Sequence, residues 1–134
     1  MSVSLTALLG FASWTLLLLI LMAFMRVGMV LSGRKQPHEF APDGSDMPPF
    51  GQRLTRAHAN CLENLPIFGA LILVAVFSGK TSVTDPLALW FLLARVLQSL
   101  VHLIRVNAPM VNLRFLFYLA QVAIMVYYAW FLFF

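Results

Sequence analysis

The sequence contains few charged residues, and acidic residues are the scarcest of them. Only 10% of its residues are charged, whereas a soluble domain averages about 25%. Five Asp and Glu residues stand against nine Lys and Arg residues. Because 61% of the residues are hydrophobic, the composition excludes an ordinary soluble domain. It indicates an integral membrane protein with a single domain over residues 1–134. We therefore interpret the net charge of +4 through membrane topology rather than nucleic-acid binding.

Cysteine and the common catalytic motifs are also lacking. Cys61 is the only cysteine, which excludes an internal disulfide, and we expect it to be a small packing residue. The sequence has no glycine-rich phosphate loop, nucleophile elbow or catalytic-triad pattern. No second histidine or cysteine pairs with His102 at ligand spacing, and His58 lies two residues off the face that carries Arg56, Asn60 and Glu63. The sequence therefore predicts no metal site.

Four apolar stretches approach the ~20 residues that a helix needs to cross hydrocarbon. They cover approximately residues 5–31, 57–78, 86–104 and 110–134. None alternates in the manner of a strand, and lipid requires every backbone group to be paired within the segment. The sequence thus predicts an all-α membrane protein built as a bundle of four transmembrane helices.

The distribution of basic residues predicts the topology. The first loop carries Arg34, Lys35 and Arg53, and the third connection carries Arg105, whereas the middle connection has only Lys80. Loops rich in Lys and Arg remain in the cytoplasm. We therefore expect a cytoplasmic first loop and periplasmic termini, in a bacterial inner membrane.

Polar side chains recur at helical spacing on the apolar stretches. Arg56, Asn60 and Glu63 are spaced i, i+4 and i+7, so they share one face of the second helix. Charge in an apolar span costs roughly 2.5–3.5 kcal/mol per residue near the helix centre, which marks this face as functional. The other helices bring similar residues to the cytoplasmic half of the membrane. The polar shell that we expect consists of Arg26, Arg56, Asn60, Glu63, Arg95, Gln98, His102, Arg114 and Tyr118.

The charges in this polar shell are unbalanced, because Glu63 is its single carboxylate. We expect Glu63 to neutralise Arg95 as a structural ion pair. The remaining arginines would then suit an anionic ligand, because a guanidinium binds carboxylates bidentately. The alternative is that the polar residues join the helices and that the arginines extend to the lipid headgroups.

The sequence from residue 56 to residue 68 (RAHANCLENLPIF) resembles the signature of the MAPEG family, the membrane-associated proteins in eicosanoid and glutathione metabolism. The resemblance extends to residues 94–96 and 102–103 of the third stretch and 112–114 of the fourth. It covers the whole chain. The loop at residues 40–44 and the short length are similar to those of small bacterial members.

This resemblance implies a homotrimer that binds glutathione between subunits in the cytoplasmic half of the membrane. It implies that Arg56, Asn60, Glu63 and Arg95 hold the tripeptide, and Arg26, Gln98 and His102 complete the expected ligand site. Arg114 resembles the basic residue that stabilises a thiolate, which is the competent nucleophile. We expect Tyr118 to assist it in catalysis.

Two functions remain open from the sequence. The first is a membrane glutathione transferase or peroxidase that acts on hydrophobic electrophiles, with glutathione as cosubstrate. The second is a non-enzymatic protein that binds an anionic lipid or amphiphile or acts as a scaffold, which the departures from the eicosanoid enzymes at Ala59, Gln98 and His102 favour. Either function predicts further copies of the chain, membrane lipids and hydrophobic small molecules as partners, and no nucleic acid.

Overall fold

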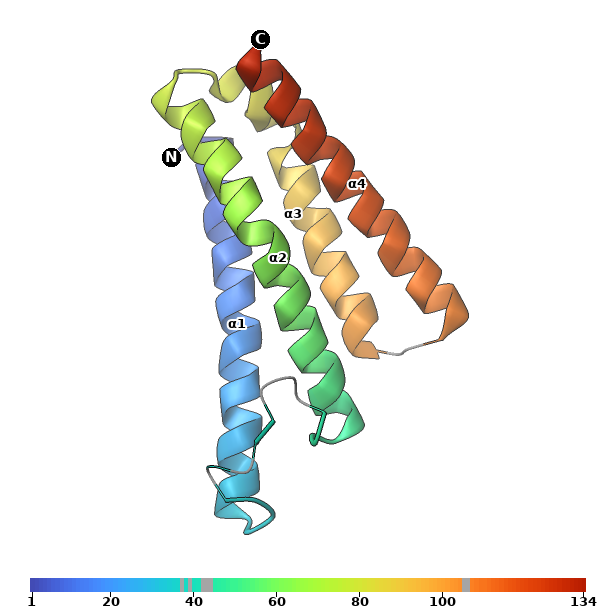
Figure 1. The fold of residues 1–134 in the computed structure, drawn as a ribbon. Helices are drawn as coiled ribbons and strands as arrows, with labels where there is room; N and C mark the ends of the chain where they lie inside the picture. Colours follow the sequence, from blue (N-terminus) through green and yellow to red (C-terminus); the bar gives the residue numbers. More distant parts are fainter. Residues whose placement is uncertain (37, 39, 42–44, 105–106) are drawn as a thin grey trace.

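The chain folds into four long helices (Figure 1). The computed structural model describes residues 1–36, 38, 40–41, 45–104 and 107–134. The helices are α1 (Val3–Leu31), α2 (Pro49–Phe77), α3 (Thr81–Ile104) and α4 (Ala108–Phe133). Each is long and apolar enough to cross a membrane. The prediction of an all-α protein with four membrane-spanning helices is confirmed. Arg105, Asp43 and Gly44, which entered the sequence argument, lie outside the described residues.

Successive helices run in opposite directions, so both termini lie at one end of the bundle (Figure 1). Gly79 has a φ of +71°, a left-handed conformation that favours glycine, and it lets the chain turn directly from α2 into α3. Helices α1, α2 and α3 pack against one another, while α4 packs mainly on α3 and less on α2. The side of α4 that faces α2 is therefore only partly covered.

Aromatic rings fill the interior between the helices. The rings of Phe68 and Phe91 are stacked with their centroids 4.0 Å apart, and Phe11 lies 5.8 Å from Phe91. All three side chains are fully buried. They join α1, α2 and α3 in one core, because aromatic pairs in such arrangements contribute about 0.5–1.5 kcal/mol beyond the area that they bury.

Hydrogen bonds fasten the helices at the end that carries the termini. The carboxylate of Asp85 accepts a hydrogen bond from the backbone N–H of Ser4 at 3.0 Å, which pairs a free donor in the first turn of α1. Tyr128 donates from its hydroxyl to the carbonyl of Thr84 at 2.7 Å. These contacts connect α1 and α4 to the start of α3.

At the opposite end, α2 begins at Pro49, well before the apolar stretch that starts near Ala57. Proline suits this position, because the first N–H groups of a helix have no partner within it. Arg53 therefore belongs to the helix, and its Nε donates to the carbonyl of Leu103 at 2.9 Å. Since α2 ends at Phe77, Glu63 lies at the middle of the helix rather than near its end.

The loop between α1 and α2 contains an ion pair between Lys35 and Asp46. The Asp46 carboxylate also accepts from the backbone N–H of Ala41 at 3.0 Å. The hydrogen bond from Lys35, followed by that from Ala41, lowers the pKa of Asp46 below its ordinary value. This pair connects the two ends of the loop.

Candidate functional site

Helix α3 supplies the centre of a buried polar cluster. Arg95, Gln98, Ser99 and His102 are all buried, and Arg95 is only 1% exposed. Their spacing places them on one face of the helix, and this face turns toward α2 and α4. Cys61 is buried against it with its Sγ 3.5 Å from Oγ of Ser99.

His102 joins α4 to α2. Nη1 of Arg114 donates to Nε2 of His102 at 2.7 Å, and the amide nitrogen Nδ2 of Asn60 is drawn 3.2 Å from Nδ1. A guanidinium only donates, so Nε2 must accept, and Nδ1 carries the proton of the neutral ring. The amide orientation that satisfies Nδ1–H presents the oxygen of Asn60 to it. The amide nitrogen of Asn60 is then available to other acceptors.

The guanidinium of Arg95 is paired with neutral groups. Its Nη1 donates to the backbone carbonyl of Asn60 at 2.7 Å, and its Nη2 donates to Oε1 of Gln98. Its guanidinium carbon also lies 5.9 Å from the centre of the Phe11 ring, where a cation–π contact is favourable. Its Nε is buried without a hydrogen-bond partner.

The expected ion pair between Glu63 and Arg95 is wrong. Within the described part of the chain, the one ion pair is that of Lys35 with Asp46. The reason is the direction of the side chains, since Arg95 extends into the interior beneath α2. Glu63, in contrast, lies on the exposed side of α2.

Gln98 extends the hydrogen-bond network to a second residue of α4. Its Oε1 also accepts from Nε2 of Gln121 at 2.6 Å, and the same nitrogen donates to the carbonyl of Phe117 at 2.9 Å. Gln121 is fully buried, and its Oε1 has no hydrogen-bond partner. A continuous set of polar contacts thus crosses from α2 through α3 to α4 at the centre of the bundle.

A groove of about 300 Å³ opens beside this network between α2 and α4. Asn60 and Glu63 line it from α2, and Arg114 and Tyr118 line it from α4. Gln98, Val111 and Phe115 complete the lining. Arg56 is exposed on α2 and lies near enough to Arg114 for the two cations to interact. This groove, which we call the polar groove, therefore presents positive charge together with one carboxylate.

The polar groove continues into an apolar one. A second hollow of about 390 Å³ shares Tyr118 with it and runs along Ile67, Leu71, Val122, Met125, Val126 and Ala129. Asn64 also lines this apolar groove, and its Nδ2 is buried without a hydrogen-bond partner. The sequence argument did not select Asn64, although a second amide directly after Glu63 in an apolar helix is a signal of the same kind.

The structure brings most of the expected polar shell together and separates one member from it. Asn60, Arg95, Gln98, His102, Arg114 and Tyr118 belong to the network or line the polar groove. Glu63 lines the groove and Arg56 lies beside it. Arg26 lies in a different pocket, with Phe40 at the end of α1. No group of three or more His, Cys, Asp or Glu side chains placed to hold a metal ion occurs among the described residues.

Such an arrangement can bind an anion and orient a nucleophile. Arginines hold carboxylates through paired hydrogen bonds, and a nearby cation lowers the pKa of a thiol bound beside it. The adjoining apolar groove offers room for a hydrophobic molecule that enters from the bilayer. The site therefore has a cationic, hydrogen-bonding groove beside an apolar one.

Comparisons with known proteins identify the family. The sequence profile of the MAPEG family matches residues 4–134, which is nearly the entire chain. Comparisons with curated proteins and with solved structures give no match. The profile match agrees with the four apolar helices and includes every residue of the polar groove. The chain is therefore a member of the MAPEG family, the membrane proteins of eicosanoid and glutathione metabolism.

Proposed function

We propose that this protein is a membrane-bound glutathione transferase or peroxidase that acts on hydrophobic electrophiles. The observation that carries the proposal is that the two grooves lie side by side between α2 and α4 and share Tyr118 in their lining. One groove is cationic and hydrogen-bonding, as a tripeptide with two carboxylates requires. The other is apolar, as a substrate dissolved in the bilayer requires. Glutathione use by the family supports this assignment.

In the proposed complex, Arg56 binds a glutathione carboxylate, and the exposed carboxylate of Glu63 binds the ammonium group of the tripeptide. The amide nitrogen of Asn60, which His102 leaves available, donates to the peptide. Arg95 and Gln98 act from the interior by fixing the α2 backbone and the floor of the groove. The polar groove would thus contact both the negatively and the positively charged groups of the tripeptide.

The chemical step follows from the position of Arg114. Its guanidinium stabilises the glutathione thiolate, which attacks the electrophilic carbon of the substrate in the apolar groove. A carbon–sulfur bond forms as the leaving group departs with its electron pair, or as an activated double bond accepts that pair and is then protonated. Tyr118 lines both grooves, and in this proposal its hydroxyl donates to the leaving group or to the thiolate.

The proposal includes a homotrimer with sites between subunits. Glu63 and Arg56 are exposed on α2, and Glu63 lies within the apolar stretch that begins near Ala57. A charged side chain that faces lipid within an apolar span costs free energy. In this proposal, a second copy of the chain packs against α2 and shields Glu63 from lipid. We place the polar groove in the cytoplasmic half of a bacterial inner membrane, because the basic loops favour this orientation.

The experiment is a conjugation assay with an apolar aryl halide and glutathione, on purified wild-type protein and on Arg114→Ala. Removal of the guanidinium abolishes conjugation while the assembly persists in detergent. Arg34→Ala is the matched control, because Arg34 is also an exposed arginine but lies outside both grooves. Retained turnover in Arg114→Ala would exclude the proposed role of this residue.

One observation favours the second function. The apolar groove extends through Leu71 and Ala129 into a further hollow of about 370 Å³. Two adjoining apolar hollows beside a cationic groove also suit an amphiphile with an anionic head. Extraction of a stoichiometric anionic lipid from the purified protein, together with no effect of glutathione on its unfolding, would favour this non-enzymatic function.

A further inference from the structure

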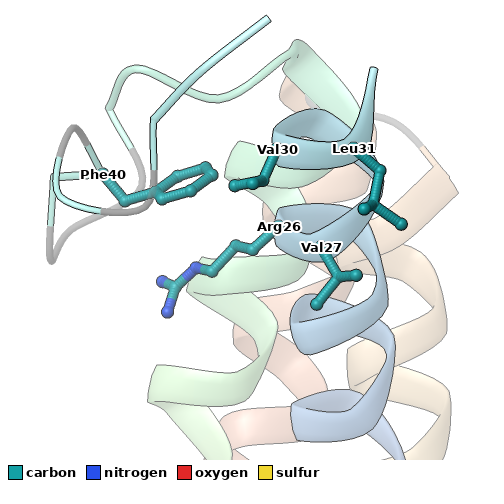
Figure 2. A pocket seen from close by; sticks show the side chains of 5 residues that line it. All are labelled: Arg26, Val27, Val30, Leu31 and Phe40. Atoms are coloured by element: carbon teal, nitrogen blue, oxygen red, sulfur yellow. The ribbon is translucent and has the colours of Figure 1, made fainter. Parts of the chain in front are cut away.

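A second pocket lies at the end of α1, away from the two grooves. It encloses about 380 Å³ and is lined by Arg26, Val27, Val30 and Leu31 of α1 together with Phe40 of the following loop. Figure 2 shows the Phe40 ring turned toward α1 and the Arg26 side chain extending beside it. None of these residues lines the polar or the apolar groove.

Arg26 supplies positive charge that no carboxylate offsets within the described part of the chain. Its guanidinium carbon lies 5.9 Å from the centre of the Phe40 ring, and Nζ of Lys35 lies 5.4 Å from the same centre. The two cations differ in their surroundings, since Lys35 is paired with Asp46. Arg26 therefore remains the cation that can bind an anion, and the ring holds its guanidinium at the pocket.

The remaining lining is apolar and uncovered. Val27 is 52% exposed and Leu31 is 82% exposed. In Figure 1 the last turns of α1 extend beyond the start of α2, which leaves them without a neighbouring helix. A pocket with one cation and several exposed apolar side chains is complementary to a molecule that has both an anionic and an apolar part.

The length of α1 places this pocket near the level of the lipid headgroups. The helix has 29 residues, which corresponds to about 43 Å at ~1.5 Å per residue. This length exceeds the ~30 Å of hydrocarbon in a bilayer. Arg26 precedes the end of α1 at Leu31 by about 8 Å at the same rise, and long basic side chains reach toward the headgroups from such depths.

We propose that this pocket binds an anionic glycerophospholipid. The phosphate of the lipid accepts paired hydrogen bonds from the guanidinium of Arg26. Its glycerol and upper acyl chain cover Val27 and Leu31, and the Phe40 ring closes the pocket on the loop side. A zwitterionic choline lipid fits less well, because its ammonium group would lie near Arg26 and Lys35.

The test measures thermal unfolding of the detergent-purified protein with added phosphatidylglycerol or phosphatidylcholine. A ligand that binds the native state raises the melting temperature as its concentration increases. We expect a saturable rise with phosphatidylglycerol that clearly exceeds the rise with phosphatidylcholine. In Arg26→Gln the two lipids should give equal shifts, whereas Arg34→Gln should retain the difference, because Arg34 is an exposed basic residue outside the pocket.

Three outcomes of the lipid titrations would overturn the proposal. The first is an equal shift with the two lipids in the wild-type protein, and the second is full retention of the difference in Arg26→Gln. The third is a loss of the difference in Arg34→Gln as large as that in Arg26→Gln, which would indicate that general surface charge attracts the lipid. Soluble glycerol phosphate must also give no shift, because a shift would indicate binding of a free phosphate. Should Arg26→Gln unfold, Leu31→Gln takes its place, and it should weaken phosphatidylglycerol binding because a polar amide replaces the apolar wall.

Discussion

Arg114 donates a hydrogen bond to Nε2 of His102 at 2.7 Å, and this contact fixes the start of α4 against the end of α3. The opposite ring nitrogen faces Asn60 on α2. His102 thereby sets the position of two groove residues that approach from different helices. A guanidinium held in this manner is oriented before a ligand arrives, which reduces the entropy lost on binding.

Replacement of His102 should therefore weaken glutathione binding although the ring is itself buried. His102→Leu leaves the groove residues Arg114 and Asn60 without the partner that orients them. We expect a lower melting temperature and an increase of roughly tenfold in the dissociation constant of glutathione, which corresponds to about 1.4 kcal/mol. Calorimetric titration with glutathione measures this dissociation constant. His102→Gln should lose less glutathione affinity, because its amide can still accept a hydrogen bond from Arg114. Equal losses of affinity in the two variants would contradict the orienting role of His102.

The two glutamines of the network should differ in their contribution to stability. Gln98 Oε1 accepts from both Arg95 and Gln121, so Gln98→Leu removes a partner from a buried guanidinium. Losing a hydrogen bond to a buried charged group costs about 1.5–3 kcal/mol. Gln121→Leu removes a side chain whose own Oε1 is unpaired, and it should cost about 1 kcal/mol. Thermal unfolding of the two variants compares them directly, and a Gln121 variant that is the less stable of the two would refute the ranking.

The exposed carboxylate of Glu63 should contribute to assembly. Glu63→Gln preserves the size of the side chain and removes its charge, so we expect a smaller fraction of trimers at low protein concentration in mild detergent. Native mass spectrometry reports the distribution of subunit numbers. Arg34→Gln serves as a control for a change of surface charge and should leave the distribution unaltered. A wild-type protein that is monomeric under these conditions would exclude sites between subunits.

The loop between α1 and α2 should loosen in acid. The pKa of Asp46 is lowered in the folded protein by its hydrogen bond to Lys35. The stabilisation is therefore complete above the unfolded value of about 3.9 and is lost as the pH falls through the lower folded value. Limited proteolysis of the loop should accelerate below about pH 4 in the wild-type protein. The Asp46→Asn variant should be cleaved rapidly at every pH. If its cleavage rate depended on pH in the same way as that of the wild-type protein, the stabilising role of the Lys35–Asp46 pair would be contradicted.

Much of the architecture could be predicted from the sequence, because membrane insertion leaves a strong signal. Apolar stretches of sufficient length indicate the spanning helices whatever their neighbours are. The starts of the helices are less visible, since α2 begins at Pro49 and includes polar residues before Ala57. Hydropathy marks the part of a helix that lies in lipid, whereas a helix ends where its backbone finds other partners.

The sequence predicted which residues make up the site better than it predicted which of them contact one another. The sequence pattern placed Asn60, Gln98, His102 and Arg114 in the cytoplasmic half of the membrane, and the structure joins them in one network. The partner of Arg95 could not be read in this way. Periodicity shows which residues share a face but not how that face is rotated, and α2 turns Asn60 toward α3 and Glu63 outward. Simple charge balance therefore selected the wrong partner.

The most direct test of the proposed function is thermal unfolding of the detergent-purified protein across a glutathione titration, with an S-alkyl glutathione in parallel. We expect a saturable rise in the melting temperature that follows ligand linkage. The rise should be retained in Arg34→Ala and strongly reduced in Arg114→Ala. The absence of any shift at millimolar glutathione in the wild-type protein would contradict glutathione binding and would leave the amphiphile as the ligand to identify.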